Sequence, residues 1–141
     1  MRSDILEQAR AIRAATLAAV AHATDDDDRL SIRVLYDPWA KGKHEVGEVY
    51  TAQGQVWECF SAYDNSIYPD IVPGNAAWFT FNRPLHGKSK ETAMPFVPVH
   101  GAHDMYRAGE YMVWTDGLVY RCKQDTSYSP ADYAPAWEAV S

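Results

Sequence analysis

The chain has 141 residues, about the size of one domain, and its content of 47% apolar and 23% charged residues is that of a folded protein. Its formal charge of −6 comes without any cluster of Lys or Arg, which argues against nucleic acid as a partner. No apolar run approaches the roughly 20 residues that span a bilayer, and the N-terminus lacks the apolar region of a signal peptide, so we expect no membrane partner.

Residues 3–23 show the three- and four-residue spacing of an amphipathic helix. The apolar positions are Ile5, Leu6, Ala9, Ile12, Ala15, Leu17 and Val20. A helix of this length cannot bury that face alone, which leaves two interpretations. Either it packs on its own chain, or it joins further copies into a homo-oligomer, for which the seven-residue spacing of Ile5, Ile12 and Ala19 is weak evidence. We assign residues 1–35 to a helical segment for oligomerisation or attachment.

Four consecutive aspartates, Asp25 to Asp28, follow this helix. Clustered carboxylates suit calcium, but a calcium loop alternates its ligands with other residues and bends at a glycine, and this run does neither. The alternative is an N-cap at Thr24 followed by an acidic first turn, where carboxylates meet the positive end of a helix dipole. We therefore predict a short helix from Asp25 to about Val34.

After Tyr36 the chain contains one pattern twice. The matching blocks are VGEVY at 46–50 with AGEYM at 108–112, and GQVWEC at 54–59 with GLVYRC at 117–122. Each pair of blocks predicts a hairpin, with its turn at Gln53-Gly54 or Asp116-Gly117. Each copy then passes through a proline-containing loop to Trp78 or Trp137, which we expect to close a small core.

The aromatic residue of each second block lies two positions before a cysteine, as Trp57 does before Cys59. Alternation along a strand places two such residues on one face. The sequence thus predicts an α+β chain, with the N-terminal helical segment followed by two small, mostly β repeats. The expected units are 36–82 and 98–141, joined by a polar linker with two prolines at 83–97.

The second copy contains a string typical of a known module. It reads Tyr106-x-x-Gly109-Glu110-x-x-Val113-x-x-x-Gly117-x-x-Tyr120-x-Cys122, then Pro130, and closes with Trp137-Glu138-Ala139-Val140. This string resembles the chitin-binding type 3 module of carbohydrate-binding families 5 and 12, and the first copy, from Pro38-Trp39 to Trp78, is a looser match. The whole arrangement resembles phage and prophage virion proteins, of the tail or head fibre type, that carry tandem modules. It consists of a helical leader, the string Leu35-Tyr36-Asp37-Pro38-Trp39, and a second unit that opens with FVPVHGAHDMY at 96–106.

The resemblance implies a carbohydrate-binding role, but one feature of the family is missing. Family members place paired tryptophans on an exposed sugar platform, and the matching positions here are Gln124-Asp125 and Ser61-Ala62. Other aromatic residues are the candidates to replace that platform, because a ring face stacks on a sugar while a hydroxyl bonds its edge. These candidates are Tyr63, Tyr68, Tyr128, Tyr133 and Trp114. The alternative is that they are packing residues.

Four histidines, His44, His86, His100 and His103, are spaced unlike any known metal motif, so we predict neither a metal nor another cofactor. Motifs of hydrolases, zinc proteases and nucleotide-binding enzymes are also missing, which predicts a protein that is not an enzyme. Two functions remain. The modules bind host cell-surface polysaccharide, or they decorate or connect a virion through contacts with other virion proteins. Both imply a protein made in the host cytoplasm and carried in the virion.

Overall fold

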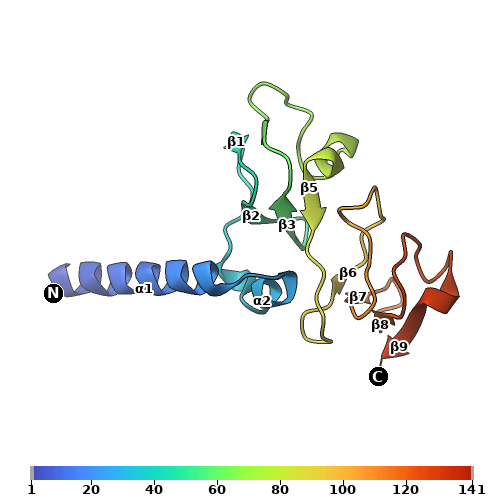
Figure 1. Cartoon of the computed structure of the whole chain (residues 1–141). Helices are drawn as coiled ribbons and strands as arrows, with labels where there is room; N and C mark the ends of the chain where they lie inside the picture. Colours follow the sequence, from blue (N-terminus) through green and yellow to red (C-terminus); the bar gives the residue numbers. More distant parts are fainter. Residues whose placement is uncertain (1, 141) are drawn as a thin grey trace.

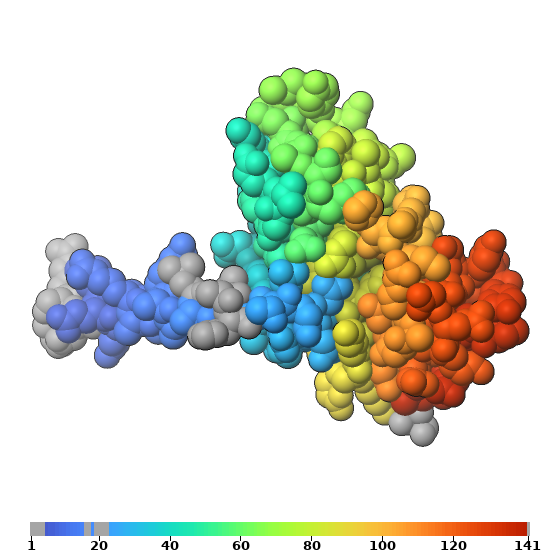
Figure 2. Space-filling view, viewed as in Figure 1, coloured from blue at the N-terminus to red at the C-terminus, as the bar shows by residue number. Residues whose placement is uncertain are grey.

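The computed structural model describes residues 2–140, leaving out the side chains of 2–4, 16–17 and 19–22. Two lobes lie side by side, and a long N-terminal helix extends away from them (Figure 1, Figure 2). The helical elements are α1 (Arg2–His22), α2 (Asp26–Ser31), η1 (Arg33–Leu35), η2 (Ala76–Thr80) and η3 (Ala134–Ala136). Within the described part, no helix is both long enough and apolar enough to cross a membrane.

The strands form three small sheets. They are β1 (Lys43–His44), β2 (Val49–Ala52), β3 (Gln55–Cys59), β4 (Tyr63–Asp64), β5 (Asn82–Pro84), β6 (Met94–Pro95), β7 (Tyr111–Val113), β8 (Val119–Cys122) and β9 (Trp137–Val140). The sheet orders are β1-β4, β2-β3-β5 and β6-β7-β8-β9. All pairings are antiparallel except β6 with β7. The predicted α+β class with mostly β content is confirmed at this level.

Both predicted hairpins form around glycines. Gly54 has φ +74° between β2 and β3, and Gly117 has φ +81° between β7 and β8. Backbone of this kind strains residues with a Cβ, so the turn glycines fix where each hairpin reverses. In the second turn, Asp116 adds a side-chain bond to the N–H of Leu118 (2.9 Å).

The two lobes contain the same backbone hydrogen bonds at matching sequence positions. The pairs are Gly47 N to Cys59 O (2.9 Å) and Gly109 N to Cys122 O (2.8 Å), Cys59 N to Glu48 O (2.9 Å) and Cys122 N to Glu110 O (2.7 Å), and Trp39 N to Thr51 O (2.8 Å) and Phe96 N to Val113 O (2.9 Å). The last pair makes Pro95-Phe96 the counterpart of Pro38-Trp39. The second set therefore begins inside the segment expected to be a linker.

The closing tryptophans are both buried but occupy different places. Trp137 lies in β9, opposite Cys122, whereas Cys59 faces Asn82 of β5. Trp78 lies in η2, four residues before Asn82, and fills the centre of the first core. The prediction that Trp78 and Trp137 occupy matching positions is therefore wrong. The loop between the cysteine strand and the last strand differs in length between the lobes, and its 3₁₀ turn contains Trp78 in the first lobe but ends before Trp137 in the second.

The segment 83–97 is folded against both lobes. It carries part of β5 and the whole of β6, and Leu85, His86 and Thr92 are buried there. Val97 packs into the core of the first lobe. The polar composition that suggested a linker reflects hydrogen bonds made by the segment's side chains, such as those of Thr92 to Asp27 (2.6 Å) and of His86 to Glu110 (3.0 Å).

The acidic run joins α2 to this segment. The N-cap is Asp25 and not the predicted Thr24, since the Asp25 side chain accepts from the N–H of Asp28 (2.8 Å), and α2 ends at Ser31 before a separate 3₁₀ turn. Asp26 forms two bonds with Arg83, at 2.7 and 2.8 Å. Burial raises the pKa of Asp26, but the hydrogen bonds and charge of Arg83 outweigh it, so that the pKa lies below its usual value.

The side chains of helix α1 that the structure describes are exposed. Ile5 and Leu6 face solvent, and the helix points away from both lobes (Figure 1). Of the predicted apolar face, Leu17, Ala19 and Val20 lie outside the side chains that the structure describes. Packing of the described part of this face on its own chain, one of the two interpretations, is therefore not what the structure contains.

Candidate functional site

The five aromatic residues chosen from the sequence fall into three different environments. Tyr63 is 6% exposed, and its hydroxyl accepts from Trp39 Nε1 (2.9 Å) and bonds to the Tyr50 hydroxyl (2.8 Å). It is a core residue, so its ring face is not available to a ligand. Tyr68 is 63% exposed on a loop of the first lobe, away from the core.

The other three candidates lie in the second lobe and line two grooves that meet. Trp114 lines the larger groove, of about 710 Å³. Tyr128, 60% exposed, and Tyr133, 40% exposed, line a smaller groove of about 320 Å³. Ser127 belongs to both linings, so the grooves adjoin there. The structure thus brings together three of the five predicted residues.

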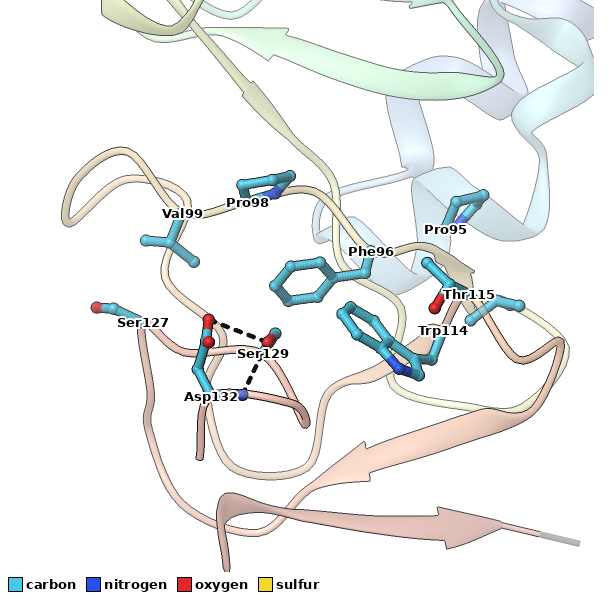
Figure 3. Close-up of a pocket in the computed structure, with 10 residues that line it drawn as sticks. Pro95, Phe96, Pro98, Val99, Trp114, Thr115, Ser127, Ser129 and Asp132 are labelled. Atoms are coloured by element: carbon cyan, nitrogen blue, oxygen red, sulfur yellow. Dashed lines mark hydrogen bonds between the residues drawn. The ribbon is translucent and has the colours of Figure 1, made fainter. Parts of the chain in front are cut away.

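The larger groove has an aromatic side and a polar side (Figure 3). Phe96 and Trp114 form the aromatic side, with ring centroids 5.2 Å apart and planes at 81°. Ser127, Ser129 and Asp132 lie across from them (Figure 3). Its volume is within the roughly 300–1,000 Å³ typical of small-molecule sites, which combine apolar walls with a few polar groups.

The aromatic side is held in place from behind. The Phe96 ring stacks on Tyr106 at 5.2 Å and 11° and meets the edge of Trp137. The Tyr106 hydroxyl in turn accepts from the N–H of Val97 (3.1 Å). Because Tyr106 and Trp137 are buried, the floor of the groove is formed before any ligand arrives.

The polar side belongs to the loop between β8 and β9. The N–H of Asp132 and the N–H of Tyr133 donate to the side chain and the carbonyl of Ser129, at 3.1 and 2.8 Å. The Tyr128 carbonyl accepts from Trp137 Nε1 (3.0 Å), which anchors the loop to the core. The Tyr128 and Tyr133 rings lie 6.4 Å apart at 55°. These bonds hold the backbone that carries both rings.

The first lobe differs from the second at the positions that match Phe96 and Trp114. Trp39 replaces Phe96, but its ring meets the edge of Trp78 at 5.7 Å and its N–H is bonded to Tyr63. Ala52 stands where the second lobe has Trp114, since Thr51 and Val113 are matched by their bonds. At these matched positions, the aromatic ring of the first lobe packs against the core, whereas Phe96 and Trp114 of the second lobe line a groove.

The histidines and cysteines serve packing. Among the described residues, no group of three or more His, Cys, Asp or Glu side chains is placed to hold a metal ion. His100 stacks on Phe79 (3.7 Å) and His103 on Phe60 (4.0 Å), which joins the two lobes. Both cysteines are free and buried. Burial raises the pKa of Cys122 to about 11 and also raises that of Cys59, so neither is a thiolate at neutral pH.

The sequence interpretation missed Phe96 and the polar side of the groove. Phe96 lies within the predicted linker at 83–97 and is not among the predicted binding residues, although the Pro-aromatic pair at 38–39 recurs at 95–96 and could have identified it. Ser127, Ser129 and Asp132 carry no motif. Only the fold of their loop places them opposite Trp114.

The comparisons with known proteins give no assignment. No protein-family model matches the sequence, and no curated protein matches it as a relative.

Proposed function

We propose that this chain is a non-catalytic, phage-type virion protein that binds cell-surface or cell-wall carbohydrate through the groove between Phe96, Trp114 and Asp132. The groove carries the proposal, because a sugar offers both an apolar ring face and hydroxyls. Phe96 and Trp114 provide rings to stack on that face, and the hydroxyls and carboxylate opposite them provide hydrogen-bond partners for its edge.

We further propose that the two β units are copies of one module of the chitin-binding type 3 kind, of which the second has kept a ligand groove. The matched backbone bonds around Cys59 and Cys122 support a duplication. The cysteine thiols also match, since Cys59 donates to the Ser61 carbonyl (3.1 Å) and Cys122 to that of Gln124 (2.8 Å). The virion setting is proposed on the likeness of the whole arrangement to phage proteins.

The charge of the larger groove favours binding over hydrolysis. Glycoside hydrolases generally use two carboxyl groups roughly 5 to 10 Å apart. Among the described residues that line the groove, Asp132 is the single acid. A groove with aromatic rings, hydroxyls and one carboxylate is suited to binding a sugar and not to hydrolysing it.

Replacing Trp114 with alanine tests the proposal. We expect the variant to lose about 2 kcal/mol of binding free energy, roughly a 30-fold weaker Kd, as for other aromatic anchors at the centre of a site. Binding would be measured by retention on a panel of purified cell-wall polysaccharides, followed by calorimetry with those retained. Tyr68→Ala is the matched control, since Tyr68 is exposed but outside the grooves, and it should bind as the unmodified protein does.

The same polysaccharide panel distinguishes carbohydrate binding from the alternative function. A decoration or connector protein that acts by protein contacts alone would be retained on none of the polysaccharides. Equal retention of the Trp114 and Tyr68 variants would show that the groove is not the site. Circular dichroism and thermal unfolding of both variants separate lost binding from lost folding.

We also propose that α1 joins copies of the chain into a homo-oligomer. Ile5, Leu6 and Ala9 are exposed on a helix that the two lobes do not cover. Burying such apolar surface against another copy is favourable. Bringing several sites together also raises overall affinity through effective concentration, which suits a weak sugar site.

The oligomer is tested by placing charge on this surface. The double substitution Ile5→Asp and Leu6→Asp should convert the oligomer to a monomer in light scattering, because two carboxylates are costly to bury in an apolar contact. Val34→Asp is the control, as Val34 is exposed elsewhere, next to α2. A monomeric unmodified protein at all concentrations would contradict the proposal.

A further inference from the structure

We infer, resting on the proposed carbohydrate role, that the two grooves form one continuous site for an uncharged oligosaccharide chain and that this site discriminates against polyanionic glycans. The length of the ligand follows from how the grooves adjoin, and its charge follows from which charged groups line them.

The continuity of the site follows from the loop between β8 and β9. Ser127 lines both grooves, and Tyr128, the next residue, lines the smaller one. Ser127 thus links the groove lined by Phe96 and Trp114 with the groove lined by Tyr128 and Tyr133. A single sugar ring can occupy only one of these places, whereas a linear chain can contact both and gain from each.

The charge of the site is negative. Among the described residues that line the two grooves, the charged side chains are Asp132 and Asp125, and no Lys, Arg or His lines either. Asp125 is neutralised by Arg107 at 3.1 Å and accepts the N–H of Ala108 (2.9 Å). Asp132 bonds to the Ser129 hydroxyl (3.2 Å), a neutral partner.

The exposed carboxylate of Asp132 therefore sets the charge preference of the larger groove. A carboxylate accepts several hydrogen bonds, so it can also accept from sugar hydroxyls. A carboxylate or phosphate on the ligand would face it at short range with no cation in the lining, and the formal charge of −6 on the chain adds to the repulsion. The site thus fits a neutral chain.

The length of the ligand is tested on an array of neutral chains of one to six residues, made of glucose, galactose or N-acetylglucosamine. We expect the hexamer of the recognised series to bind at least tenfold more tightly than its monomer. Tyr133→Ala should weaken the hexamer about fivefold and leave short chains unchanged, whereas Trp114→Ala should weaken both. Equal affinity for monomer and hexamer, or equal effects of both substitutions on all lengths, would overturn the continuous site.

The charge preference is tested with the best-retained neutral polysaccharide and its carboxymethylated derivative. We expect the derivative to bind at least fivefold more weakly at low salt. Asp132→Asn keeps the shape of the side chain and removes its charge, so it should reduce the ratio between the two affinities, although the neutral chain also binds more weakly because an amide accepts fewer hydrogen bonds than a carboxylate. A derivative that binds as well as the parent, or a difference that Asp132→Asn leaves intact, would overturn the inference on charge.

The experiments distinguish failure of the carbohydrate role from failure of the preference for a long, neutral chain. If no glycan of either kind is retained, both the carbohydrate role and this inference are wrong. If a monomer or a polyanion is bound as well as a neutral chain, the carbohydrate role stands and this inference alone is overturned.

Discussion

Replacing Arg83 with methionine should lower the free energy of unfolding by about 3 to 5 kcal/mol, the cost of removing one member of a buried ion-pair network. Arg83 donates to both oxygens of Asp26 and to Glu58 at 2.8 Å, and Glu58 is also held by Arg29 at 2.8 Å. The four groups join α2 to β3 and β5. Burial disfavours the charged guanidinium, but the two carboxylates outweigh it and raise the pKa of Arg83.

The size of the effect comes from what the substitution leaves behind. Asp26 keeps only the N–H of His86 (3.2 Å) as a partner from the segment 83–97, and a poorly compensated carboxylate remains in a mostly buried place. Urea unfolding at pH 7 is the measurement, since the pKa of Asp26 lies below its usual value and the group is charged there. At pH 7 both Arg83 and Asp26 carry their charges in the unmodified protein.

A matched control is Arg121→Met. Arg121 pairs with Glu138 at 2.9 Å between β8 and β9, but both side chains are exposed. Such surface pairs contribute about 0 to 1 kcal/mol. Similar losses of unfolding free energy for the two variants would show that the Arg83 network contributes no more than an exposed ion pair.

Gly87→Ala should destabilise the protein by about 3 kcal/mol, at the upper end of the usual cost of overpacking. A Cβ at this position would lie 2.3 Å from the carbonyl oxygen and 2.6 Å from the carbonyl carbon of Thr92. Both are backbone atoms. Thr92 is held by its bond to Asp27 (2.6 Å), and the Gly87 carbonyl accepts from Tyr111 (2.8 Å). Neither side of the contact can move without breaking these bonds.

Gly101→Ala is the comparison for this substitution. A Cβ there would meet no heavy atom within 4 Å, and its φ lies outside the left-handed region. Alanine should therefore be neutral or stabilise by about 0.4 to 1 kcal/mol, by restricting the unfolded chain. Thermal unfolding of both variants is the measurement. An unchanged melting temperature for Gly87→Ala would contradict the close approach of the two chain segments.

Much of the local structure was predictable because its causes are local. Gly54 and Gly117 fix the hairpin turns by allowing a positive φ, and the acidic run begins a helix by capping its first turn. The burial of Trp78 and Trp137 also followed from their size. These features depend on a few neighbouring residues or on one side chain.

The candidate site was only partly predictable. The sequence predicts Tyr128 and Tyr133 as loop residues that replace the missing tryptophan platform, with Trp114 as a further aromatic candidate. The structure places these three residues in the two grooves and Tyr63 in the core. Tyr63 and Tyr68 lie in the same loop region, yet one is core and the other exposed, because β4 pairs with β1 and turns Tyr63 inward toward Tyr50 and Trp39.

By itself, the sequence determined the helix, the two hairpins and the duplicated pattern of residues, since these depend on spacing and on the conformational freedom of glycine. The tertiary structure alone decided that 83–97 is packed rather than free, that Phe96 and Asp132 lie on opposite sides of a groove, and that Trp39, the counterpart of Phe96, packs against the core of the first lobe. These outcomes depend on contacts between residues far apart in the chain, such as Asp26 with Arg83. Such contacts leave no periodic signal in the sequence, because either partner alone resembles an ordinary surface residue.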